Sequence, residues 1–236
     1  MSDEPLAADE ILDGVYRALC AHGYASLTMQ DIADECDKSK SLLHYHYDTK
    51  EDLLVAFLSR MITDYEEQLE DEVDDSPVDR LALFLAQFVF TPDEEERQSF
   101  HLALLEMRSQ GPFNERMREQ LVRSDEVLRE TVADILRDGI DEGVFDAVDP
   151  EQTAALLVAT LDGGRTRQVT LNENPTDVSY TRAVVEQAMT HIVEPLLASD
   201  VELPPLDETL AKLSAVDSDA DVDDVDEPPH SSAQES

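Results

Sequence analysis

The chain carries only four lysines, and three of them, Lys38, Lys40 and Lys50, fall within thirteen residues. The whole sequence is strongly acidic, with 55 aspartates and glutamates against 17 lysines and arginines. A cluster of lysines in one short segment is the pattern that contact with nucleic-acid phosphates requires. This segment is therefore the first candidate for a binding surface.

The residues after the first of these lysines divide into two faces if they form a helix over 39–47. One face carries hydrogen-bond donors and an aromatic edge: Lys40, Ser41, His44 and Tyr45. The opposite face carries Leu43 and Tyr47, which can pack on Ile32 and Ala33 of the segment before it. A helix with a donor-rich outer face and an apolar inner face is suited to reading the DNA major groove.

The elements that must position this helix are two further short helices. Residues 7–22 place apolar side chains at helical spacing, and Gly23 ends that helix. Thr28, with Asp31 three residues later, is a capping pair for a second short helix, and Ser39 caps the third. Three short helices with a tight turn between the second and third predict a helix-turn-helix.

The remainder of the chain shows helical periodicity and no alternating run of useful length, so the predicted fold is all-α. The start signal Asp149-Pro150 is especially clear. Further helices are expected at about 50–69, 81–90, 94–110, 113–139, 150–168 and 178–198. We divide the chain into a helix-turn-helix DNA-binding domain (1–58), a larger helical ligand-binding and dimerisation domain (59–200) and an acidic, largely disordered tail (201–236), with a short helix near 206–215.

The net charge of −38 would by itself argue against a nucleic-acid partner. The acidic residues could instead bind basic partners, or they could keep the surface hydrated in a potassium-rich cytoplasm. The second reading is favoured because acidic residues occur along every segment. We therefore expect a salt-adapted protein with the acidic composition of a halophile.

Other chemistry is poorly supported by the sequence. His44 and His46 have no third and fourth ligand at suitable spacing, so no metal site is predicted. Cys20 and Cys36 read as two small buried side chains, with a redox switch as the weaker alternative. The sequence shows no nucleophile–base pair and no phosphate-binding loop, so neither an enzyme nor a cofactor is expected.

Residues 8–58 resemble the signature of the tetracycline-repressor (TetR/AcrR) family of transcriptional regulators. The resemblance runs without a gap through Gly23-Tyr24, Thr28, Ile32-Ala33, Ser39-Lys40 to Tyr47, and Lys50-Glu51-Asp52-Leu53. The signature usually carries Gly-Val in the turn, where this chain has Asp37-Lys38, and an aromatic residue at the position of His44. These departures leave open whether the turn is left-handed and whether its second residue plugs the core.

The resemblance implies a role for each matching side chain. Base edges or the adjacent backbone would be contacted by Gln30, Lys40, Ser41, His44 and Tyr45. DNA phosphates would be contacted by Thr28, His46 and Lys50.

The resemblance also implies a C-terminal domain that binds an unknown small-molecule effector and forms a homodimer. Candidate pocket residues are Phe84, Phe88, Phe100, Leu104, Met107, Met117 and Leu121, although phenylalanines in such positions are more often plain core. Candidate dimer contacts on the helices near 150–168 and 178–198 are Ala154, Leu157, Val158, Leu161, Val184, Ala188 and Ile192.

The function implied is that of a ligand-responsive regulator, most often a repressor, which binds a palindromic double-stranded operator as a dimer and is released by an inducer. The alternative is an interaction module of the same fold that has lost specific DNA binding. No apolar run approaches the roughly 20 residues that span a bilayer, and Met1–Pro5 lacks a signal-peptide pattern. We expect a cytoplasmic protein without a membrane partner.

Overall fold

A computed structural model describes residues 3–71, 75–172, 174 and 177–223. Ten α-helices account for most of these residues, and no strand forms among them; an isolated β-bridge joins Phe145 to Leu197. The predicted all-α class, with an N-terminal helix-turn-helix and a larger helical domain, is confirmed. Within the described residues no helix is long and apolar enough to cross a membrane.

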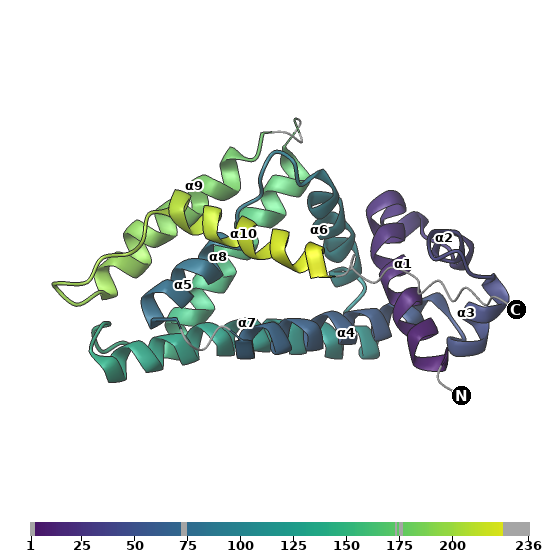
Figure 1. The fold of residues 1–236 in the computed structure, drawn as a ribbon, viewed down its shortest axis with the longest axis horizontal. Coiled ribbons are helices and arrows are strands. Elements are labelled where there is room, and N and C mark those ends of the chain that lie inside the picture. Colours follow the sequence, from purple (N-terminus) through teal and green to yellow (C-terminus); the bar gives the residue numbers. More distant parts are fainter. Residues whose placement is uncertain (1–2, 72–74, 173, 175–176, 224–236) are drawn as a thin grey trace, which may run out of the picture.

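The first three helices form a small unit at one end of the molecule (Figure 1). They are α1 (Asp3–Ser26), α2 (Met29–Glu35) and α3 (Lys40–His46). Gly23 interrupts α1 with φ 66° and ψ 166°, a conformation that glycine adopts without steric cost. Helix α4 (Lys50–Asp71) leads from this unit toward the larger domain and packs along α7.

The helices of the larger domain are α5 (Pro77–Ala86), α6 (Glu95–Arg108), α7 (Glu115–Glu142), α8 (Pro150–Leu171) and α9 (Ser179–Ala188). Side-chain caps set the starts of α5, α7 and α8, whereas α6 and α9 begin without one. Asp149 accepts a hydrogen bond from the backbone N of Gln152 (3.0 Å), and Pro150 occupies the first turn of α8. The chain continues from α9 through a π-helical turn (Met189–Val193) and a 3₁₀ turn (Glu194–Leu196).

Helix α10 (Leu206–Asp223) lies within the region predicted as a tail. It packs on α5, and Leu206 and Thr209 are buried there. The short helix expected near 206–215 is therefore part of a longer one that covers the larger domain. Residues 224–236 of the predicted tail lie outside the described residues.

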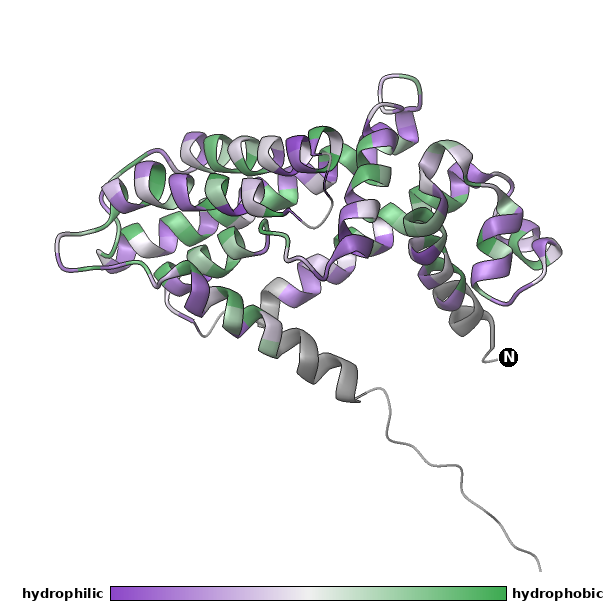
Figure 2. Cartoon of the chain, turned by 90° about the horizontal axis from the view of Figure 1, so that it is seen from above, coloured by the Kyte–Doolittle hydropathy of each residue, from purple (hydrophilic) through white to green (hydrophobic). Residues whose placement is uncertain are grey.

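Apolar and polar residues alternate along the helices (Figure 2), and the apolar ones gather into two cores. One core fills the larger domain and includes Leu85, Leu136 and Leu161. The other joins Ile11 and Leu43 of the N-terminal helices to side chains from the larger domain: Phe100, Ala103, Met107 and Met117. Helix α6 consequently packs against α1 on one side and α8 on the other.

Candidate DNA-binding surface and ligand cavity

The outer face of α3 presents the predicted donor set to solvent. Exposed side chains on this face are those of Lys40, Ser41, His44 and Tyr45. Tyr45 is 73% exposed, whereas Leu43 on the opposite face is fully buried. An exposed ring of this size has no role in the chain's own core, so it is available to a partner.

The start of α3 is held by Ser39, whose hydroxyl accepts a hydrogen bond from the backbone N of Leu42 (3.2 Å). His46 is half-buried, and its ring lies edge-on to that of Tyr45 at 5.1 Å between centroids. His46 is therefore set back from the exposed face.

Helix α2 begins with a complete capping box. The Thr28 hydroxyl donates to Asp31 Oδ2 (2.7 Å) and accepts from the backbone N of Asp31 (3.3 Å), while Asp31 also accepts from the backbone N of Thr28 (2.8 Å). These hydrogen bonds lower the pKa of the Asp31 carboxyl. Gln30 is exposed, and its amide donates to Asp34 Oδ1 (2.7 Å). Thr28 and Gln30, both predicted to contact DNA, thus already form hydrogen bonds with neighbouring residues of the chain.

The turn between α2 and α3 is left-handed although it lacks glycine. Asp37 has φ 51°, and the backbone N of Lys38 donates to the carbonyl of Ala33 (3.0 Å). Aspartate is among the few residues that tolerate this region. The Lys38 side chain forms an ion pair with Glu10 on α1, which takes the place of an apolar plug.

Lys50, predicted to contact phosphate, points toward the protein instead. Its Nζ donates to the carbonyls of Leu27 (3.0 Å) and Tyr24 (3.3 Å) and lies 4.6 Å from the Tyr24 ring centroid. The ammonium therefore fastens α4 to the turn before α2. Of the three clustered lysines, Lys40 is the one whose ammonium has no partner among the described residues.

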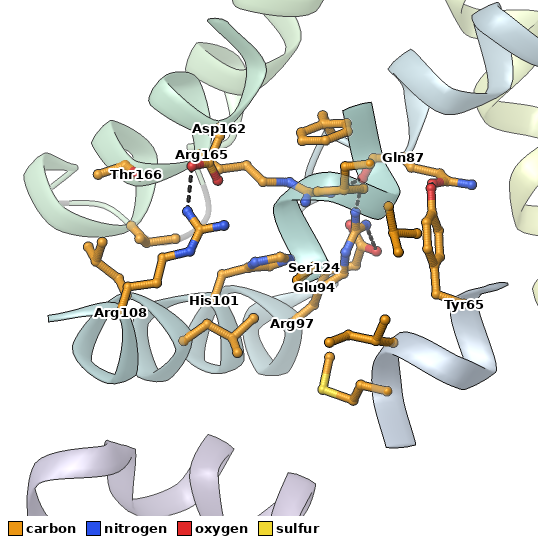
Figure 3. A pocket seen from close by; sticks show the side chains of 18 of the residues that line it. Tyr65, Gln87, Glu94, Arg97, His101, Arg108, Ser124, Asp162, Arg165 and Thr166 are labelled. Atoms are coloured by element: carbon orange, nitrogen blue, oxygen red, sulfur yellow. Dashed lines mark hydrogen bonds and ion pairs between the residues drawn. The ribbon is translucent and has the colours of Figure 1, made fainter. Parts of the chain in front are cut away.

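A cavity of about 480 Å³ lies in the larger domain among α4, α6, α7 and α8 (Figure 3). Of the predicted pocket residues, Phe88 and Leu104 line it. The other five do not: Phe84 belongs to the core of the larger domain, and the core shared with α1 contains Phe100, Met107, Met117 and Leu121. The pocket prediction placed too many aromatic and methionine side chains on the cavity wall, because core and pocket residues share the same composition.

Charged side chains that no sequence pattern predicted also line the cavity. Arg97 and Arg165 both donate to the carbonyl of Gln87, and Arg108 pairs with Asp162 (Figure 3). His101 lies among them, and burial together with the neighbouring guanidinium groups holds the pKa of this imidazole well below its usual range. Charged residues on a helix usually face solvent, so no local sequence pattern marked these as cavity residues.

The predicted dimer face needs a correction. Ala154, Leu157, Val158 and Leu161 on α8, and Ala188 on α9, are buried within the chain's own core, and Val184 packs on Gly164. Ile192 is partly buried against the same core. These residues do form an apolar stripe, but it packs α8 against α9 and α7 within one chain. The exposed face of these helices carries instead Ala155, Leu156, Ala159, Gly163, Tyr180 and Ala183.

Two family models match the chain. Residues 11–57 match the model for bacterial regulatory proteins of the tetR family, and residues 77–197 match that for the C-terminal part of BetI-type transcriptional repressors.

Individual relatives agree. A TetR transcription regulator from Haloarcula marismortui has 38% sequence identity and a TM-score of 0.71, covering 81% of this chain and 98% of that one. A transcriptional regulator from Saccharomonospora viridis, solved in complex with choline, shares the fold at 22% identity and a TM-score of 0.66, covering 80% of this chain and 97% of that one.

A shorter match links the chain to IcaR of Staphylococcus epidermidis, a negative transcriptional regulator of a biofilm operon. The two are 31% identical over 87 residues, which span 36% of this chain and about half (47%) of IcaR. The matches to both family models and to the Haloarcula regulator cover the helix-turn-helix and the larger domain alike. The chain belongs to the tetR family of bacterial regulatory proteins.

Proposed function

We propose that the protein is a DNA-binding transcriptional repressor that acts as a homodimer, binds a palindromic operator and is released by a small-molecule inducer, and that it is not an enzyme. The observation that carries this proposal is the exposed α3 face of Lys40, Ser41, His44 and Tyr45 on a buried apolar back. The match to a repressor-type C-terminal domain supports the sign of regulation. The acidic surface supports the further proposal that the protein works in a salt-rich cytoplasm.

A dimer would place two α3 helices on half-sites one helical turn of DNA apart, roughly 34–36 Å. The exposed face of α8 and α9 supports such an assembly, since Leu156 and Tyr180 are 55% and 43% exposed beside small residues that permit close helix approach. A groove between α7 and α8 includes three of these small residues, Ala155, Ala159 and Gly163, and is lined from α7 by Asp125 and Arg129.

The cavity is well placed to influence DNA binding. Its wall includes α4, which begins just after α3, and α6, which packs directly on α1. The Phe100 ring lies 4.7 Å from that of Tyr16 on α1, while the next residue, His101, lines the cavity. A ligand that prefers one position of α6 would shift the population of DNA-competent dimers. The choline complex of the Saccharomonospora regulator supports a small-molecule site in this fold.

Replacing Lys40 with alanine is expected to lower affinity for a specific operator roughly tenfold or more, because a side chain that contacts a base edge carries about 1–3 kcal/mol of discrimination. The matched control is Lys38→Ala, whose ammonium already pairs with Glu10 and should change affinity little. Lys50→Ala is unsuitable as a contact probe because its ammonium fastens α4 to the turn before α2. Fluorescence anisotropy on a labelled duplex, selected from fragments of the source genome, measures both variants.

If no genomic duplex is selected by the wild-type protein, or if Lys40→Ala binds like wild type, the result would contradict specific DNA binding through α3 and favour the alternative function. The fold would then serve as an interaction module without specific DNA binding. The observation in its favour is the charge of residues 1–58, which contain twelve acidic side chains and only four basic ones.

Leu156→Arg is expected to convert the dimer to a folded monomer and to abolish high-affinity operator binding. The arginine would be placed in the proposed interface without a partner, and a monomer contacts one half-site only. Light scattering coupled to size-exclusion chromatography measures the mass, and circular dichroism checks folding. Phe113→Arg, at an 86% exposed position in the α6–α7 connection, is the matched control and should remain dimeric. A dimeric Leu156→Arg protein would place the interface elsewhere.

A further inference from the structure

The charge balance of the cavity is opposite to that of the chain. The whole sequence has about three acidic residues for each basic one, 55 against 17. The cavity wall has three arginines, Arg97, Arg108 and Arg165, against two carboxylates, Glu94 and Asp162. In a protein that otherwise uses so few basic residues, three of them lining one cavity indicate a binding preference for negative charge.

The two carboxylates are already paired. Glu94 Oε1 accepts from Arg97 Nη1 (2.5 Å), and Asp162 accepts from Arg108. Arg165 forms no ion pair with a carboxylate among the described residues, and its Nη2 donates only to the backbone carbonyl of Gln87. The cavity therefore has one positive charge in excess.

Arg165 also has an unused donor. Its Nε is buried and has no hydrogen-bond partner, although a guanidinium presents five N–H groups. The guanidinium lies 4.0 Å from the centroid of the Phe88 ring, which fixes its plane at the cavity wall. Arg97 donates to the same Gln87 carbonyl, so two positive groups converge on one neutral acceptor. Such a cluster is incomplete without an anion.

The protonation equilibria of the wall agree with this geometry. Burial, and next to it the charge of Arg97, lower the pKa of the Arg165 guanidinium to about 9. Burial and all three arginines depress the pKa of His101, which is therefore neutral at pH 7. A bound anion would oppose both effects by favouring the charged forms.

Much of the remaining wall of the cavity is formed by aliphatic side chains from α4, α6, α7 and α8, namely Ile62, Leu104, Leu105, Val127, Leu128 and Val169. A ligand that fills the cavity must therefore combine a charged head with a hydrocarbon body.

We propose that the effector is an anionic amphiphile whose oxyanion head, a carboxylate or a phosphate, binds Arg165 and whose hydrocarbon body lies against the aliphatic wall. This assignment rests on the proposed function, in which the cavity is the inducer site. A quaternary ammonium ligand such as the choline of the Saccharomonospora complex would meet the excess positive charge. This chain therefore differs from that regulator in the charge of its ligand.

The test uses the full-length protein and probes that share one eight-carbon body: octanoate, octyl phosphate, octanamide and octyltrimethylammonium. Isothermal titration calorimetry at one fixed potassium chloride concentration gives the affinity for each. We expect octanoate or octyl phosphate to bind at least about tenfold more tightly than octanamide, because hydrogen bonds to a charged partner are markedly stronger than neutral ones. The stronger of the two anions identifies the head group. The cation should not bind measurably.

Substitutions of Arg165 test whether this side chain binds the anionic head group. Arg165→Gln should lose the preference for the anion, and Arg165→Lys, which keeps the charge, should retain much of it. Arg182→Gln is the matched control, since Arg182 pairs with Glu186 and Asp207 on the outside of the larger domain and should not affect binding. Thermal melts of each variant establish that it is folded, and if Arg165→Gln does not fold, the comparison rests on Arg165→Lys and the probe series.

Release of a labelled operator duplex by the same probes distinguishes failure of the anionic-ligand proposal from failure of the proposed regulatory function. An anion that binds through Arg165 and releases DNA supports both. A neutral or cationic probe that binds more tightly and releases DNA overturns the anionic assignment while the proposed function stands. Failure of both anions to bind a protein that still binds its operator overturns the assignment. Failure to bind any duplex overturns the proposed function, whatever the probes do.

Discussion

Raising potassium chloride from moderate to molar concentration should leave the affinity for a specific operator unchanged or increase it. A DNA-binding protein with 6–10 phosphate contacts loses about 10³–10⁵ in affinity merely between 50 and 200 mM salt, because it releases counterions from the duplex. Residues 1–58 here carry four basic side chains against twelve acidic ones. Three of the four, Arg17, Lys38 and Lys50, are engaged by Glu35, by Glu10 and by backbone carbonyls. Few cationic side chains are therefore available to displace counterions from the duplex.

Screening acts in the opposite direction on the acidic residues. The screening length falls from about 8 Å at physiological ionic strength to roughly 3 Å at 1 M, so carboxylates away from the contact no longer repel the phosphates. The measurement is a titration of labelled operator at several potassium chloride concentrations, with circular dichroism at each one to establish folding. A steep, monotonic loss of affinity in folded protein would mean that ordinary counterion release dominates.

Gly139→Ala should destabilise the larger domain by about 3 kcal/mol, the upper end of the usual cost of overpacking a core. A Cβ at this position on α7 would lie 2.1 Å from Cδ2 of the Phe145 ring, which is 3% exposed. The ring cannot easily withdraw. The backbone N of Phe145 donates to the carbonyl of Gly139 (3.0 Å), and Gly143 with φ 77° turns the chain tightly between them.

In a protein of this size, such a loss corresponds to a fall in Tm of roughly 6–12 °C. Thermal unfolding followed by circular dichroism at fixed salt measures it. The double variant Gly139→Ala/Phe145→Leu tests the cause, because a smaller side chain removes the overlap and the two effects should not add. Additive losses would show that the clash with Phe145 is not the reason.

Features set by neighbouring residues were predictable from the sequence. The Thr28–Asp31 capping box and the proline start of α8 depend on a few consecutive residues, and the structure contains both. Gly23, predicted to end the first helix, interrupts it instead, and α1 continues to Ser26. The exposed face of α3 was also predictable, since it depends on helical periodicity alone.

Features that depend on contacts between distant segments could not be predicted from the sequence. The inward orientation of Lys50 arises from carbonyls more than twenty residues earlier in the chain. The stripe on α8 that includes Ala154 and Leu161 has the composition of a dimer interface, but the same composition serves contact within a chain, and periodicity does not separate the two. The cavity arginines come from α6 and α8, which no sequence motif connects.

Helix α6 belongs to both halves of the molecule at once, and this has a consequence for engineering. Phe100, Ala103 and Met107 complete the hydrophobic core of the N-terminal helices, and Glu106 accepts a hydrogen bond from the backbone N of Ala25 (3.1 Å). A fragment cut near residue 58 would leave that core open to water and should aggregate rather than fold. A chimaera that grafts this DNA-reading unit onto another sensor must therefore carry the inner face of α6 with it, or rebuild that face residue by residue.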